Sequence, residues 1–260
     1  MMPLPVVIVF TILFGLCVGS FLNVVVARLP VGRSIVTPGS ACPRCEKGIA
    51  WYDNIPVLSY ALLGARCRSC RAPISWRYPA IELLCGALFA LAYLYFGLSP
   101  RLVAALILLA VLVAITWIDL DHQIIPDVLS LPSIAVGLLL SVGPGGIGWR
   151  DAVAGTMVGG GLFVLIIVGS SLAIGQPGMG IGDVKLGAML GAFLGWKLVL
   201  LSILLSVLIG GPLAAILLAT GRKARKDPVP FGPFLALGGM ISLFWGEALL
   251  AWYFGQFLSE

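Results

Sequence analysis

The stretch 102-LVAALILLAVLVAITWI-118 runs for seventeen residues without a charged side chain and then meets Asp119. This length is close to the ~20 apolar residues that cross a hydrocarbon layer of ~30 Å. In such a layer only helices and closed barrels satisfy the backbone hydrogen bonds, and the stretch lacks the alternating polarity of a barrel strand. It therefore predicts a membrane-spanning helix.

The rest of the 260-residue chain has the same character, with 60% apolar residues, 10% charged residues and a mean hydropathy of +1.09. The first apolar run lacks a preceding basic region and a cleavage site, so we expect a retained helix. The stretch 186–219 is too long for one span and short for two, which predicts a short or tilted sixth helix beside a locally thinned bilayer or a polar cavity. The chain is predicted to be an all-α polytopic membrane protein of about eight helices: 5–27, 80–97, 102–118, 128–142, 152–174, 184–195, 198–219 and 232–256.

Charge predicts the orientation of these helices. With eight spans, thirteen of the sixteen Lys and Arg residues fall on the side of the polar segment 28–79. By the positive-inside rule this side is cytoplasmic, and both termini lie outside. The net charge of +5 then reports membrane topology and not nucleic-acid binding. We expect a first transmembrane helix (1–27), a small cytoplasmic domain (28–79) and a membrane-embedded domain (80–260).

Six cysteines divide into two groups. Cys17 and Cys85 lie in apolar runs and are expected to be small buried residues. The other four form two CxxC pairs separated by 21 residues, a pattern typical of a structural zinc site. Disulfides are the alternative, disfavoured in a reducing cytoplasm, and a redox-active CxxC would need only one pair. The predicted zinc ligands are Cys42, Cys45, Cys67 and Cys70.

Two acidic clusters stand at predicted membrane boundaries. Asp119 opens the stretch Asp119–Asp127, and Asp183 ends the sequence Gly180-Ile-Gly-Asp183. Taken singly, such residues are solvated or cap helices. Two carboxylates on one membrane face can instead activate water for amide hydrolysis, one ionised and the other protonated. Flanking glycines would let a substrate approach closely, and Lys185 would either stabilise the ionised form or mark the interface.

With these features the chain resembles the type 4 prepilin peptidases, the bacterial leader peptidases of type IV pilus and type II secretion systems. The resemblance rests on Gly19–Val25, Arg28–Pro30, both CxxC pairs, Trp51–Val57, Arg77–Pro79 with Glu82, Asp119–Asp127, Gly180–Lys185 and Pro230–Phe234.

This resemblance implies a GxGD-type aspartyl endopeptidase of the bacterial inner membrane that cleaves the leader of prepilins and pseudopilins after a glycine. It assigns catalysis to Asp119 and Asp183, with support from Gly180, Gly182, Lys185, Asp121 and Asp127. It also implies N-methylation of the new N-terminus from S-adenosylmethionine, an activity associated with the cysteine-bearing domain. The alternative from another class is an ion- or proton-coupled transporter with interfacial aspartates.

Overall fold

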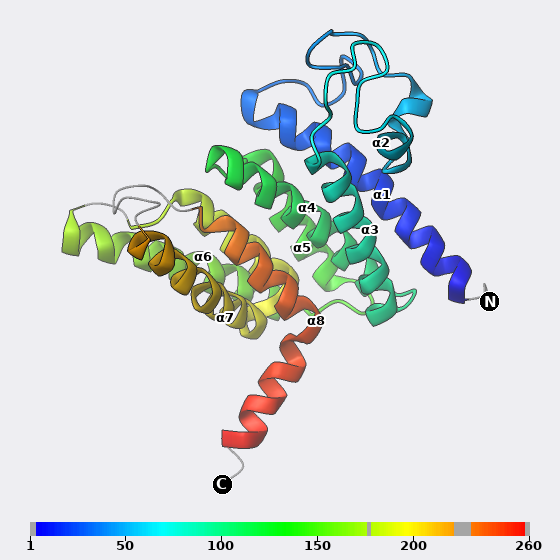
Figure 1. The fold of residues 1–260 in the computed structure, drawn as a ribbon. Coiled ribbons are helices and arrows are strands. Elements are labelled where there is room, and N and C mark those ends of the chain that lie inside the picture. Colours follow the sequence, from blue (N-terminus) through cyan, green and yellow to red (C-terminus); the bar gives the residue numbers. More distant parts are fainter. Residues whose placement is uncertain (1–3, 176–177, 221–229, 258–260) are drawn as a thin grey trace. The chain divides into compact units, whose positions relative to one another are not determined.

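The computed structural model describes residues 4–175, 178–220 and 230–257, which form helices joined by short turns and one longer polar segment (Figure 1). Within these ranges the only β pairings are two isolated bridges. The helices are α1 (Leu4–Arg28), η1 (Leu29–Val31), η2 (Trp51–Asn54), α2 (Leu58–Leu62), α3 (Arg77–Phe96), α4 (Pro100–His122), α5 (Asp127–Val142), α6 (Trp149–Ile174), α7 (Ile181–Ala219) and α8 (Gly232–Phe257).

The described helices confirm an all-α polytopic membrane protein. Six of them are long and apolar enough to cross a membrane, and the shorter α5 is also apolar. Inside α7, Gly195 leaves helical geometry, with φ 79° and ψ 173°, so the apolar stretch 181–219 consists of two segments. Figure 1 shows α7 reversing its direction along its length. This reversal brings the number of apolar segments among the described residues to eight and confirms the predicted break near residue 195.

The chain divides into two compact units. The first extends to Leu98 and includes Leu112–Ala114, and the second holds Ser99–Val111 and the chain from Ile115 onward. In the first unit α1 packs on α3 through glycine: a Cβ at Gly15 would lie 2.7 Å from the carbonyl oxygen of Cys85. Cys85 is buried in this contact as predicted, but Cys17 is exposed, and the prediction of its burial was wrong. An apolar run does not reveal which of its faces meets a neighbour.

In the second unit α6 packs on α7 through glycines that let the two backbones approach closely. A Cβ at Gly187 would lie 2.7 Å from the carbonyl oxygen of Gly159 and equally close to the Phe163 ring. Gly155 and Gly191 make the same kind of backbone contact one turn away. Close approach of this kind is how helices associate in lipid, where the hydrophobic effect does not drive them together. The packing holds the start of α7, and with it Asp183, in a defined place.

Candidate active site and cysteine centre

Asp119 lies in the last turn of α4 and is 5% exposed. The helix extends through His122 and ends at Gln123. The backbone of Gln123 is in the left-handed conformation, and its N–H donates to the carbonyl oxygen of Asp119. The carboxylate of Asp119 accepts a hydrogen bond of 3.0 Å from the N–H of Gly232, at the first turn of α8. Asp119 is thus held by a helix 113 residues away in sequence.

Asp183 lies in the first turn of α7, where its Oδ2 accepts a hydrogen bond of 3.2 Å from the N–H of Gly180. Its carboxylate interacts electrostatically with that of Asp119. Both residues belong to the second compact unit. The structure therefore brings together the two aspartates that the sequence placed in separate clusters.

Ile125, before α5, and Asp127, at its first turn, contact the start of α7 at two further points. The side chain of Ile125 covers Gly182, where an added Cβ would lie 3.1 Å from it. Asp127, in the first turn of α5, forms an ion pair with Lys185, one turn after Gly182. Lys185 is therefore paired with Asp127, and the pair connects the first turns of α5 and α7. Asp121 is exposed on the last turn of α4.

Gly232 lies in the stretch Pro230–Phe234, which carried part of the resemblance, but the sequence did not predict it as a site residue. A Cβ at this position would lie 2.6 Å from Oδ2 of Asp119 and 3.0 Å from its Cγ. Only glycine lets the backbone donate to the carboxylate at this range. The sequence signal was Phe231-Gly-Pro at a helix start, which carries no indication of its partner.

The sulfur atoms of Cys42, Cys45, Cys67 and Cys70 all lie within 4.8 Å of one another, and none forms a disulfide. Four sulfurs placed about 2.3 Å from one zinc ion at tetrahedral corners would lie about 3.8 Å apart. The Sγ atoms of Cys42 and Cys70 are 3.8 Å apart, which fits this geometry. The predicted cluster can therefore hold a metal ion.

The two CxxC pairs sit on ribbons of the same design. In the first ribbon the N–H of Cys42 donates to Lys47, the N–H of Glu46 donates back to Cys42, and Ala41 bridges to Gly48. In the second the N–H of Cys67 donates to Ala72, the N–H of Arg71 donates back to Cys67, and Arg66 bridges to Pro73. In both ribbons the residue after the second cysteine has a left-handed backbone conformation, with φ 57° at Glu46 and 58° at Arg71.

Backbone N–H groups favour the thiolate form at one of the four cysteines, Cys42. The N–H groups of Arg44 and Cys45 point at the Cys42 sulfur and lower the pKa of this thiol to about 6. A thiolate is the form that binds metal. Between the cysteines of the second ribbon, Arg68 makes two hydrogen bonds to Asp53 of η2, at 2.8 and 2.6 Å, and holds the pKa of that carboxyl below its usual range. The ion pair ties η2 to the second ribbon.

Two protein-family profiles match most of the chain. A bacterial peptidase A24 N-terminal domain covers residues 13–96, and the type IV leader peptidase family covers residues 106–215. The prepilin leader peptidase/N-methyltransferase of Aeromonas hydrophila is 39% identical over 95% of this chain and 93% of its own length. Proteins with the same name are 40% identical in Pseudomonas aeruginosa, over 94% of this chain and 92% of the relative, and 47% identical in Myxococcus xanthus, over 85% and 67%. No solved structure matches.

Proposed function

The chain belongs to the type IV leader peptidase family, and on that premise we propose that Asp119 and Asp183 cleave the leader peptides of prepilins and pseudopilins after glycine. The observation that carries the proposal is the electrostatic interaction between these two carboxylates, each of which accepts a hydrogen bond from a backbone N–H. No comparison supports the alternative of a transporter.

The chemistry follows from the coupling of the two side chains. Two carboxylates that share a confined site titrate as a pair, so that one is ionised while the other keeps its proton. The ionised carboxylate takes a proton from water, and the oxygen of that water attacks the carbonyl carbon of the scissile bond. The protonated carboxylic acid donates to the carbonyl oxygen. Collapse of the tetrahedral species breaks the C–N bond, and the departing amine takes up a proton.

The placement of the site suits a membrane-anchored substrate. Asp119 is near the end of one apolar helix and Asp183 near the start of another, so both stand where apolar segments begin or end. We place this end of the helices at the cytoplasmic face of the bacterial inner membrane, with both termini outside, because the basic residues of segment 28–79 would lie there. The four cations at 222, 223, 225 and 226 in the charge count lie outside the described residues.

The polar segment 28–79 would bind a metal and would not cleave the leader. Its cysteine centre would hold one structural Zn²⁺, since the donor set is all thiolate and leaves no open position. Because the relatives are named N-methyltransferases, we also assign to this chain the methylation of the newly exposed N-terminal amine. S-adenosylmethionine would supply an electrophilic methyl group: the C–N bond forms as the C–S bond breaks, the sulfonium leaves as a neutral thioether, and the amine loses a proton. The functional division remains 1–27, 28–79 and 80–260.

The test is cleavage of a purified prepilin by three variants. Asp119→Asn and Asp183→Asn keep the shape of each side chain but cannot form the proton-sharing pair, so each is expected to abolish cleavage. Asp151→Asn is the matched control, because Asp151 is an exposed residue in the first turn of α6. Substantial cleavage by either of the first two variants, in folded protein, would refute the assignment of the catalytic pair.

A further inference from the structure

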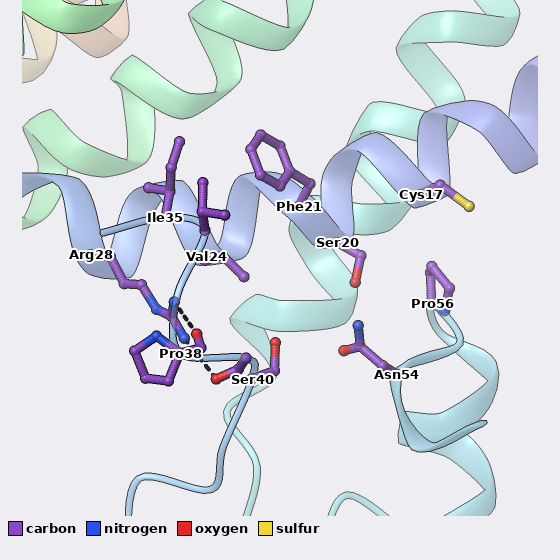
Figure 2. Close-up of a pocket in the computed structure, with 12 residues that line it drawn as sticks. Cys17, Ser20, Phe21, Val24, Arg28, Ile35, Pro38, Ser40, Asn54 and Pro56 are labelled. Atoms are coloured by element: carbon purple, nitrogen blue, oxygen red, sulfur yellow. Dashed lines mark hydrogen bonds between the residues drawn. The ribbon is translucent and has the colours of Figure 1, made fainter. Parts of the chain in front are cut away.

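A cavity of about 370 Å³ lies in the first compact unit, and none of the four clustered cysteines lines it. Its walls come from α1, from the turn at 35–40 and from the end of η2, and they include Ser20, Phe21, Val24, Arg28, Ser40 and Asn54. Figure 2 shows the polar ends of Ser20, Ser40 and Asn54 pointing toward one another, while Phe21 and Val24 give an apolar side. Drug-sized ligands bind in cavities of about 300–1,000 Å³ with this mixture of apolar surface and a few polar groups.

Arg28 builds one wall of the cavity. Its guanidinium donates to the carbonyl oxygens of Ser34, Pro38 and Gly39, at 3.1, 2.7 and 3.0 Å. These bonds, two of them drawn in Figure 2, fix the turn at 35–40 beside α1. Both terminal nitrogens of the guanidinium already donate to carbonyl oxygens. Arg28 therefore shapes the cavity wall and does not offer a pair of free N–H groups to bind an anion.

A buried carboxyl group lies behind Ser20. Glu82 of α3 is 7% exposed and accepts a hydrogen bond from the hydroxyl of Ser20, which lines the cavity. Its Oε2 also accepts a bond of 2.8 Å from the N–H of Val57, which follows the cavity residue Pro56. Val57 has φ 61°, a rare backbone state for a β-branched residue, and Glu82 holds it there. The protease chemistry uses none of these groups.

From this arrangement we infer that the cavity binds the methyl donor, S-adenosylmethionine, an inference that rests on the methyltransferase activity proposed above. The amide of Asn54 offers a donor and an acceptor side by side, the pattern that pairs with an adenine edge. Phe21 offers a face on which a flat ring stacks. The carboxyl group of Glu82 lies behind Ser20, accepts a hydrogen bond from its hydroxyl and so orients this polar group in the cavity wall.

Charge balance separates this ligand from other small molecules. Arg28 lines the cavity, but its guanidinium already donates to three carbonyl oxygens, so the site offers no unpaired cation. A phosphate-rich nucleotide would need unpaired basic groups or a free helix N-terminus. An adenosyl group attached to a zwitterionic amino acid needs neither. The cavity is lined by residues from three stretches that carry much of the family resemblance, and binding of the methyl donor would be their common role: Gly19–Val25, Arg28–Pro30 and Trp51–Val57.

The experiment measures binding of tritiated S-adenosylmethionine to the purified full-length protein by equilibrium dialysis. Val24→Phe adds a ring to the cavity wall, and Asn54→Leu removes the amide at similar size. We expect each to raise the Kd by about tenfold or more. Val9→Phe is the matched control, because Val9 is an exposed residue of the same helix that does not line the cavity. It is expected to bind the donor as the unaltered protein does.

Leader cleavage is assayed in the same preparations to show that each variant is folded, and two results would overturn the inference. If the unaltered protein binds the donor and both Val24→Phe and Asn54→Leu bind it equally well, the cavity is not the site, and the methyltransferase proposal stands. If the unaltered protein neither binds the donor nor transfers its methyl group while it cleaves prepilin, the methyltransferase proposal fails together with the cavity assignment.

Discussion

Replacing Gly232 by alanine tests how closely Asp119 is held. The added Cβ would lie 2.6 Å from Oδ2 of Asp119, about 0.8 Å short of an ordinary contact, while the N–H that donates to it stays in the backbone. Phe231 precedes this glycine, and its ring packs edge-on against that of Phe163 with 6.1 Å between the centroids, which helps to hold the start of α8. The carboxylate is the far end of a side chain, so we expect it to move instead. A misplacement of this size at a catalytic group costs on the order of 10²-fold in rate, or about 2.7 kcal/mol of transition-state stabilisation.

The assay is the kcat/KM for cleavage of a purified prepilin, measured beside thermal unfolding in the same detergent. Gly255→Ala is the matched control, because it makes the same change near the other end of α8, where a Cβ meets nothing within 4 Å. We expect Gly232→Ala to lose about a hundredfold in kcat/KM with little change in melting temperature, and Gly255→Ala to cleave normally. Equal cleavage by the two variants would show that the position of Asp119 at Gly232 does not control the reaction.

Three further outcomes follow from the packing, the ion pair and the cysteine centre. Gly187→Ala forces a Cβ to 2.7 Å from the α6 backbone and should lower the free energy of unfolding by about 1–3 kcal/mol. Gly161→Ala on α6 is the control, because its Cβ meets nothing within 4 Å and should leave the stability unchanged. Equal melting temperatures of the two variants would contradict the packing. Lys185→Met and Asp127→Asn remove the same ion pair, whose side chains are 27% and 57% exposed, so each should cost less than about 1 kcal/mol and the double variant little more; additive losses would show that the pair is not coupled. Metal analysis should find about one zinc per chain, reduced by Cys42→Ser; disulfide-bonded thiols without metal in the unaltered protein would reject the zinc assignment.

Most of the helices could be predicted from the sequence because the thickness of the hydrocarbon layer sets the length of an apolar helix that crosses it. Apolar runs of membrane-crossing length indicated the helices, and the excess length of 186–219 indicated an interruption that the structure places at Gly195. The spacing of the cysteines indicated a cluster because two CxxC pairs bring four sulfurs together with little help from the rest of the fold. These signals are local, and each could be read within its own segment.

The details that position the aspartates could not be predicted in the same way. The bond from Gly232 to Asp119 joins residues 113 positions apart, and nothing near either residue specifies the other. The pairing of Lys185 with Asp127 depends on how α5 meets α7, which neither segment encodes alone. The exposure of Cys17 depends on which face of α1 meets α3, and a helix that is apolar all round does not indicate it.

The repeated design of the cysteine ribbons has a consequence for how this protein can vary. Each ribbon forms its turn from adjacent residues, so joining the two halves requires only that the 21 residues between them close into a loop. Loop closure of this length costs about 3 kcal/mol, and doubling it adds only about 0.6 kcal/mol, against the ~10–16 kcal/mol that zinc supplies to small thiolate sites. The connecting residues are therefore under little constraint from the metal, and insertions among them should be tolerated thermodynamically. The sequence and length of this connection can therefore change during evolution while the metal site is kept.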